Sequence, residues 1–197
     1  MEKRNWKRSV TLKQRMVLCL AAFFAAFALQ LALNGYQARA VQQVQDDQMG
    51  NFNAISRFQG GVESSISILE AYRWENGETE EMLEKLRAAC STSNAWLWRI
   101  RFNMDGLQNV SDEQWVLYGA VETTYGSYSA LLEELEGCLS SGQDAKASQL
   151  YYNKVSVCGG YLSQYTMQLL KASILDAQTT YTEISELGER IAMMQIV

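Results

Sequence analysis

The sequence contains no histidine and no proline among its 197 residues. Without histidine, the chain lacks the side chain that most often serves as general base, metal ligand or phospho-acceptor near neutral pH. Without proline, nothing in the composition interrupts long helices, and a loop-rich fold is disfavoured. The acidic residues show none of the spacings typical of a metal site. The sequence therefore predicts no catalytic residue, no metal site and no cofactor, and an enzyme is the least favoured class of function.

Positive charge is scarce beyond the first residues. Residues 1–15 hold six of the 17 basic residues and one acid, which gives this segment a net charge of +5. Because the whole chain carries −5, residues 16–197 carry −10. Such an acidic surface disfavours nucleic acid as a partner and keeps this part of the chain away from anionic lipid headgroups.

Residues 16–35 form an apolar run without a charged side chain. At about 1.5 Å of rise per residue, a helix of this length spans about 30 Å, the thickness of a bilayer core. Because basic residues precede the run, we expect the N-terminus in the cytoplasm and the bulk of the chain outside the cell membrane. A cleaved signal peptide is the alternative, since Ala38-Arg39-Ala40 matches a cleavage pattern. The run is longer than the hydrophobic region of most signal peptides, so an uncleaved anchor is the preferred interpretation.

Beyond the anchor, apolar residues recur at three- and four-residue spacing in four long stretches. Turn signals separate them at Asn76-Gly77, Asp105-Gly106 and Ser140-Ser141-Gly142, and Ser111 to Gln114 has the pattern of a capping box. The buried positions predicted for the first two stretches are Val41, Phe52, Ile55, Val62, Ile66, Leu69, and then Leu83, Leu86, Cys90, Ser93, Leu97, Ile100, Met104. Those predicted for the last two are Tyr118, Val121, Tyr125, Tyr128, Leu132, Leu135, Leu139, and then Tyr151, Val155, Cys158, Leu162, Tyr165, Leu169, Ala172, Ile174, Ala177, Tyr181, Ile184, Ile191.

Short connections make consecutive helices antiparallel neighbours. The predicted fold class is therefore all-α, a membrane-anchored up-down-up-down four-helix bundle whose long first helix is continuous with the transmembrane anchor. The last residues are apolar and end without a charge, so we expect a second membrane helix and a chain that is a fragment of a longer protein. The predicted domains are a cytoplasmic basic tail (1–15), a transmembrane helix (16–35), an extracytoplasmic helical sensor domain (36–190) and the start of a truncated second transmembrane helix (191–197).

A basic tail, an anchor, an extracytoplasmic helical domain and a return to the membrane form a known layout. It resembles the N-terminal sensor region of bacterial two-component sensor histidine kinases. The resemblance implies a cytoplasmic kinase core with a phospho-accepting histidine, which is not part of these residues. It also implies a homodimer in the membrane and a signal, either a small ligand or an extracytoplasmic protein, that shifts the fourth helix relative to the first. The alternatives are a chemoreceptor-type ligand-binding region and a membrane-anchored scaffold for protein partners.

Small residues fall at about the same height in all four predicted helices, counted from the end far from the membrane. Because an interior glycine costs about 0.5–1 kcal/mol relative to alanine, their coincidence at one level needs a reason. Close helix packing or a shared kink is one reason, and a ligand cavity bordered by tyrosines is the other. The candidate sensory layer consists of Gly60, Gly61, Cys90, Tyr125, Gly126, Cys158, Gly159, Gly160 and Tyr161.

Three of the four cysteines, Cys90, Cys138 and Cys158, follow the predicted anchor, whereas Cys19 lies in it. An odd number leaves at least one of the three unpaired within the chain. The second and fourth helices are diagonal in the simplest bundle, which places Cys90 and Cys158 too far apart for a disulfide. We expect these cysteines to act as small buried hydrophobes.

Overall fold

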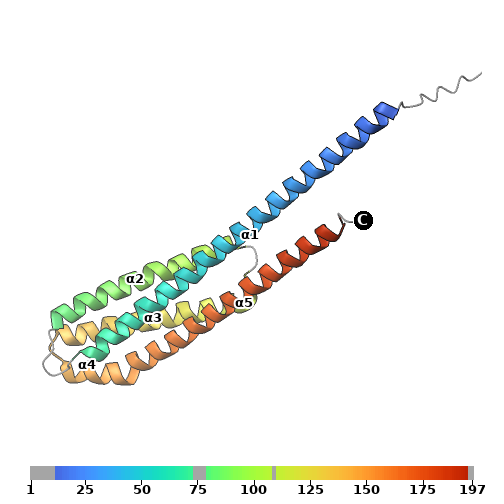
Figure 1. Ribbon diagram of the computed structural model, residues 1–197. Helices are drawn as coiled ribbons and strands as arrows, with labels where there is room; N and C mark the ends of the chain where they lie inside the picture. The colour runs from blue at the N-terminus through green and yellow to red at the C-terminus, as the bar shows by residue number, and fades with distance from the viewer. Residues whose placement is uncertain (1–11, 73–78, 108–109, 195–197) are drawn as a thin grey trace, which may run out of the picture. The chain divides into compact units, whose positions relative to one another are not determined.

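The computed structural model describes residues 12–72, 79–107 and 110–194. Within these ranges the chain is helical apart from short turns and contains no strand, so the predicted all-helical class is confirmed. Three predictions lie outside the described residues: the fold of most of the basic tail, the turn at Asn76-Gly77 and the last three residues of the second membrane helix. The elements are α1 (Leu12–Ala71), α2 (Thr79–Gly106), α3 (Asp112–Ser140), α4 (Asp144–Leu150), the π-helical turn η1 (Tyr151–Val155) and α5 (Ser156–Met194), as Figure 1 shows.

The chain divides into two compact units, the first ending at Gln43 and the second beginning at Val44. The first unit contains the N-terminal part of α1, whose apolar side chains are exposed. Phe23 and Phe24, for example, meet edge to face but remain largely uncovered. By its length and composition, α1 is the one helix among the described residues that could cross a membrane. A contiguous apolar surface of this kind is unfavourable in water.

In the second unit, the C-terminal part of α1 and the other helices share one apolar core. Phe58 of α1 meets Tyr125 of α3 edge to face, with ring centroids 5.4 Å apart. The hydroxyl of Tyr125 in turn donates a hydrogen bond of 2.8 Å to the carbonyl oxygen of Cys90 in α2. A buried tyrosine hydroxyl needs a hydrogen-bond partner. Such a bond therefore determines which faces of two helices meet and how far apart the helices lie.

The buried faces of α2 and α3 match the periodicity of the sequence. Every position predicted for α3 is buried, and every position predicted for α2 is buried except Cys90, which is half-buried. In α1, Phe52 is partly exposed, and its place in the core is taken by Ala54 and Phe58. In α2 and α3, apolar residues at three- and four-residue spacing are thus sufficient to identify the buried face.

The fourth helix begins at Asp144 and continues without a gap, but its residues 151–155 form the π-helical turn η1, which was not predicted from the sequence. Its closing hydrogen bond runs from the Ser156 N–H to the Tyr151 carbonyl, five residues back. The buried residues Ala147, Tyr151 and Val155 recur every four residues. In an α-helix of 3.6 residues per turn, such a repeat drifts by about 40° at each step. A wider turn cancels the drift and keeps all three side chains in the core.

Beyond η1 the buried face of α5 also differs from the prediction. Thr166 is fully buried where Tyr165 was predicted, while Ile174 and Tyr181 are exposed and Thr180 is buried instead. The buried threonine hydroxyl of Thr166 donates to the carbonyl oxygen of Leu162 at 2.8 Å, so it enters the core without an unpaired polar group. Apolar character alone therefore does not identify the inner face of this helix.

The N-terminus of α3 is held by a side chain from α5. Ser111 accepts a hydrogen bond of 3.3 Å from the Gln114 N–H, which is half of the predicted capping box. The other half is replaced: the Ser111 N–H donates to Asp176 Oδ2 at 3.1 Å, and the Gln114 side chain donates to the same oxygen at 2.8 Å. A carboxylate at a helix N-terminus is favoured by both the free N–H groups and the helix dipole.

A second polar contact joins α5 to α1 nearby. Asn51 is fully buried, and its Nδ2 donates to the hydroxyl of Ser173 at 3.5 Å. Because Ser173 precedes Asp176 by one turn, the two contacts lie on the same face of α5. Together they bind α5 to α1 and to α3 by directional bonds at a level where most of the neighbouring core is apolar.

We predict that Asp176→Ala destabilises the second unit by about 2 kcal/mol, because two N–H donors lose a charged acceptor and the Gln114 amide is buried. The free energy of unfolding in urea, followed by circular dichroism of the full chain in detergent, measures the effect. Asp112→Ala is the matched control, since Asp112 is exposed in the first turn of the same helix. It should lose only about 0.3–1 kcal/mol of dipole stabilisation. Equal losses for the two variants would contradict a specific role of Asp176.

Candidate functional site

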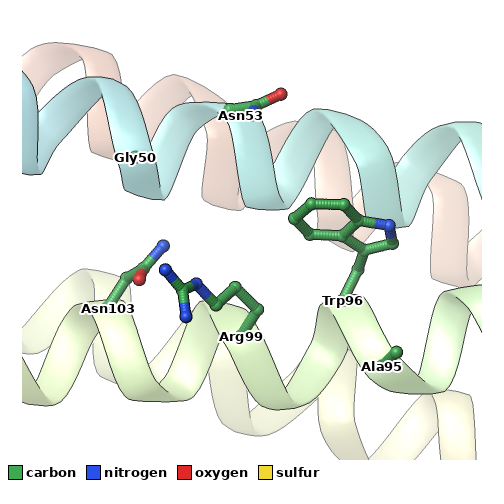
Figure 2. A pocket seen from close by; sticks show the side chains of 6 residues that line it. All are labelled: Gly50, Asn53, Ala95, Trp96, Arg99 and Asn103. Carbon is green, nitrogen blue, oxygen red and sulfur yellow. The ribbon is translucent and has the colours of Figure 1, made fainter.

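A groove between α1 and α2 has a volume of about 430 Å³. Such a volume falls in the range of about 300–1,000 Å³ found for small-molecule sites. Figure 2 shows the Arg99 and Asn103 side chains standing next to each other between the two helices, with the Trp96 ring on the other side of Arg99. The lining residues are Gly50 and Asn53 from α1, and Ala95, Trp96, Arg99 and Asn103 from α2.

Arg99 is the only charged residue among the described residues that line the groove. Among the described residues, no carboxylate lies within ion-pair distance of its guanidinium, whose one recorded contact is the face of Phe102, 5.3 Å from the ring centroid. Arg101, only two residues away, differs because it pairs with Glu122 at 3.7 Å and with Asp105 at 4.0 Å. The groove therefore offers a positive charge that the described part of the protein does not neutralise.

Neutral residues shape the rest of the groove. Trp96 is half-buried and packs against the core, so its indole ring is held in place. Asn53 and Asn103 make no side-chain hydrogen bond among the described residues, which leaves both amides available. A Cβ at Gly50 would stand 3.9 Å from the Asn103 amide nitrogen, so any larger side chain there would grow into the groove. A glycine in mid-helix is unfavourable, and the space it leaves here is one consequence of its presence.

The predicted sensory layer is only partly assembled around the core. A Cβ on Gly61 would collide with the Ser93 hydroxyl of α2, and a Cβ on Gly159 would lie 3.1 Å from Ile66 Cδ1 of α1 and 3.2 Å from Tyr128 Cε2 of α3. These two glycines therefore stand where helices approach closely. The other three glycines of the layer, Gly60, Gly126 and Gly160, face open space, and Tyr161 is exposed.

The tyrosine hydroxyls at this level are already bonded within the protein. Tyr128 shares a hydrogen bond of 2.9 Å with Ser65, and Tyr125 donates to Cys90 as described above. Burial raises the pKa of both phenols far above the usual range, so both stay neutral. The binding role of the layer stays a prediction, whereas close packing accounts for Gly61 and Gly159.

All four cysteines are free thiols. Cys138 is buried, while Cys90 and Cys158 are half-buried, the latter with its sulfur 3.7 Å from the Thr124 carbonyl oxygen. Burial, followed by the nearby charge of Glu136, raises the pKa of Cys90 to about 11. A thiol with such a pKa is a poor nucleophile at neutral pH. No cluster of three or more metal-ligating side chains occurs in the described part of the chain.

The groove was not predicted from the sequence, although one signal was present. Trp96, Arg99 and Asn103 follow one another at spacings of three and four, so they share a single face of α2. Gly50 and Asn53 share a face of α1 in the same way. What the sequence did not reveal is that these two faces are opposite each other, because their pairing depends on contacts about 45 residues apart.

We predict opposite effects for alanine at two adjacent glycines. Gly159→Ala should lower the free energy of unfolding by about 1 kcal/mol, because Tyr128 is held by Ser65 and has little room to yield. Gly160→Ala should raise it by about 0.5–1 kcal/mol, because its Cβ meets nothing within 4 Å and alanine favours the helix. Urea unfolding of the two variants measures both. A stabilising Gly159→Ala would show that the contact with Ile66 and Tyr128 is not tight.

We also predict that stability falls as the pH rises above about 9. The Cys90 thiol ionises near its ordinary pKa of 9.0 in the unfolded chain but only at about 11 in the folded chain, so the folded state holds the extra proton. Its contribution is complete below pH 9.0 and declines toward pH 11. The buried phenol of Tyr118, with its pKa raised to about 12 by burial and by Glu122, adds to the decline at higher pH. Urea unfolding between these pH values should show a shallower decline for Cys90→Ala, and identical slopes would contradict the assignment.

Comparison of the chain with protein-family models, with curated proteins and with solved structures gives no match in any of the three. No relative therefore supplies a role for the groove or for Arg99, and the role has to be inferred from the lining residues and their contacts. The feature that distinguishes the site is that one of its walls, α1, also carries the exposed apolar segment.

Proposed function

We propose that this chain is the membrane-anchored sensing and signal-transmitting region of a two-component sensor histidine kinase. The observation that carries the proposal is the continuity of α1, a single 60-residue helix. Its N-terminal part is apolar and long enough to cross a bilayer, and its C-terminal part lines the groove and enters the core. A helix without a break can pass a displacement along its axis from one end to the other.

The proposed arrangement is an up-down-up-down four-helix bundle on the outer face of the cell membrane. The six basic residues of 1–15 stay in the cytoplasm, and α1 crosses the bilayer and rises into the bundle. The last residues of the chain begin a second crossing. Two copies pair in the plane of the membrane, as the resemblance to sensor kinases implies.

Signalling then follows from the position of the groove. A molecule that contacts α1 and α2 together favours the packing in which those contacts are best, and only this difference in affinity can drive a change. The bonds from Asn51 to Ser173, and from Ser111 and Gln114 to Asp176, couple α5 to α1 and α3. When α1 moves, these bonds pull α5 with it, and α5 is the helix that leads toward the C-terminus.

We predict that alkaline phosphatase fused after Gly142, in the turn between α3 and α4, is active in cells, whereas green fluorescent protein fused there is dark. Phosphatase needs the oxidising exterior, so its activity places the second unit outside. Replacing Lys3, Arg4, Lys7 and Arg8 by glutamine should reduce phosphatase activity, because the charge that sets the orientation is lost. Fluorescence with an inactive phosphatase would contradict the proposed topology.

The kinase assignment is tested on the gene. The reading frame past Val197 should encode the rest of a second apolar helix, then a helical segment with a histidine and an ATP-binding domain. The parent protein in membrane vesicles should become labelled with phosphate from ATP on that histidine. A long methyl-accepting coiled coil in its place would favour the chemoreceptor alternative, and a stop codon directly after Val197 would favour the anchored scaffold.

A further inference from the structure

We propose that the groove between α1 and α2 binds a small organic monoanion whose carboxylate pairs with Arg99 and whose apolar body lies along Trp96. The proposal rests on the proposed sensing function, for which it names the class of ligand. It is argued from the charge of the lining, the positions of its hydrogen-bonding groups and its size.

The charge of the groove calls for an anion. On the same helix, Lys85 pairs with Glu81, Arg87 with Glu136, and Arg101 with Glu122. Arg99 is the exception among the described basic residues of α2, and Arg57, Lys146, Lys154 and Lys171 on other helices likewise have no ion pair among the described residues. What sets Arg99 apart from these is its place in the lining of the groove. A guanidinium presents two parallel N–H donors that match the two oxygens of a carboxylate. The missing partner of Arg99 is therefore supplied best by a carboxylate from outside the protein.

The rest of the lining selects a monoanion over a more highly charged ligand. The amides of Asn53 and Asn103 are neutral. Figure 2 shows the Asn103 side chain beside Arg99 and the Asn53 side chain pointing away from it, so Asn103 is the one that can donate a further hydrogen bond to a carboxylate oxygen. A phosphate or dicarboxylate would bring a second negative charge for which the lining holds no second cation. The lining would give that charge no partner, and the net charge of −10 on residues 16–197 disfavours a second negative charge on the ligand.

The remaining space fits an apolar group. Trp96 and Arg99 are three residues apart on the same face of α2. Figure 2 shows the Trp96 ring on the side of Arg99 opposite Asn103, so a ligand that pairs with the guanidinium has to extend along the Arg99 side chain to reach the indole. Gly50 and Ala95 have no side chain large enough to fill this space. The volume of about 430 Å³ accommodates a phenyl-sized body.

Calorimetric titration of the full chain in nanodiscs tests the proposal, with benzoate, phenylacetate and hexanoate as the probes. At least one should bind saturably, and its neutral amide, benzamide for benzoate, should bind at least about tenfold more weakly because it cannot pair with the guanidinium. Phenylphosphonate, which carries a second negative charge, should also bind more weakly than benzoate. Saturable binding of none of the three probes up to about 10 mM would overturn the proposal.

The variants separate the groove from general charge effects. Arg99→Gln should weaken binding at least about tenfold, and Arg99→Lys should weaken it less, since lysine keeps the charge but loses the paired donors. Arg57→Gln is the matched control: it removes the same charge from an exposed arginine on α1 that does not line the groove, and should change the affinity by less than about twofold. Trp96→Phe should weaken binding severalfold. Equal affinity of Arg99→Gln and wild type would refute the site.

Thermal melting shows whether a variant that fails to bind is still folded. The Tm of Arg99→Gln should equal that of the wild type, because the Arg99 side chain is exposed and has no ion pair among the described residues. The binding measurement does not use the kinase output. A failure to bind carboxylates would thus leave the sensing function standing with another ligand. Binding by a chain whose gene encodes no kinase would leave the site standing and remove the kinase.

Discussion

The structure depends on one constraint, that α1 remains a single helix through two different patterns of exposure. Before Gln43 its apolar side chains are uncovered, and after Val44 only one face is apolar and buried. No proline interrupts it. In the second unit, Ile55, Phe58, Val62 and Leu69 of α1 are part of the same buried core as residues of α2, α3 and α5.

Polar contacts give this apolar packing its specificity. A directional bond such as Tyr125 to Cys90 or Asn51 to Ser173 is lost on a shift of one residue, so these bonds add to the register that the close-packed apolar side chains already favour. Asp176 makes two of these bonds, because its Oδ2 accepts from both the Ser111 N–H and the Gln114 side chain at the start of α3.

The sequence predicts the helices well and the relations between them less well. Periodicity alone identified the inner faces of α2 and α3, because in these helices the apolar residues follow a regular spacing. It failed at Thr166, which is fully buried where the neighbouring Tyr165 was predicted, and it did not predict the π-helical turn, although Tyr151 and Val155 are buried as predicted. The site shows the same division: the close approach at Gly61 and Gly159 follows from small residues at matching heights, but the groove at Arg99 arises from the pairing of two faces that no local pattern specifies.

The π-helical turn η1 has a consequence for how the length of this chain can vary. A π turn holds one residue more than the α-helical turn it replaces, and both turn the chain through nearly the same angle. Removing one residue between Tyr151 and Val155 would leave the faces of α4 and α5 in their present orientation, whereas the same deletion within α3 would rotate everything after it by about 100°. The chain thus carries one extra residue inside a core helix, at a place where a single deletion leaves the helix faces aligned.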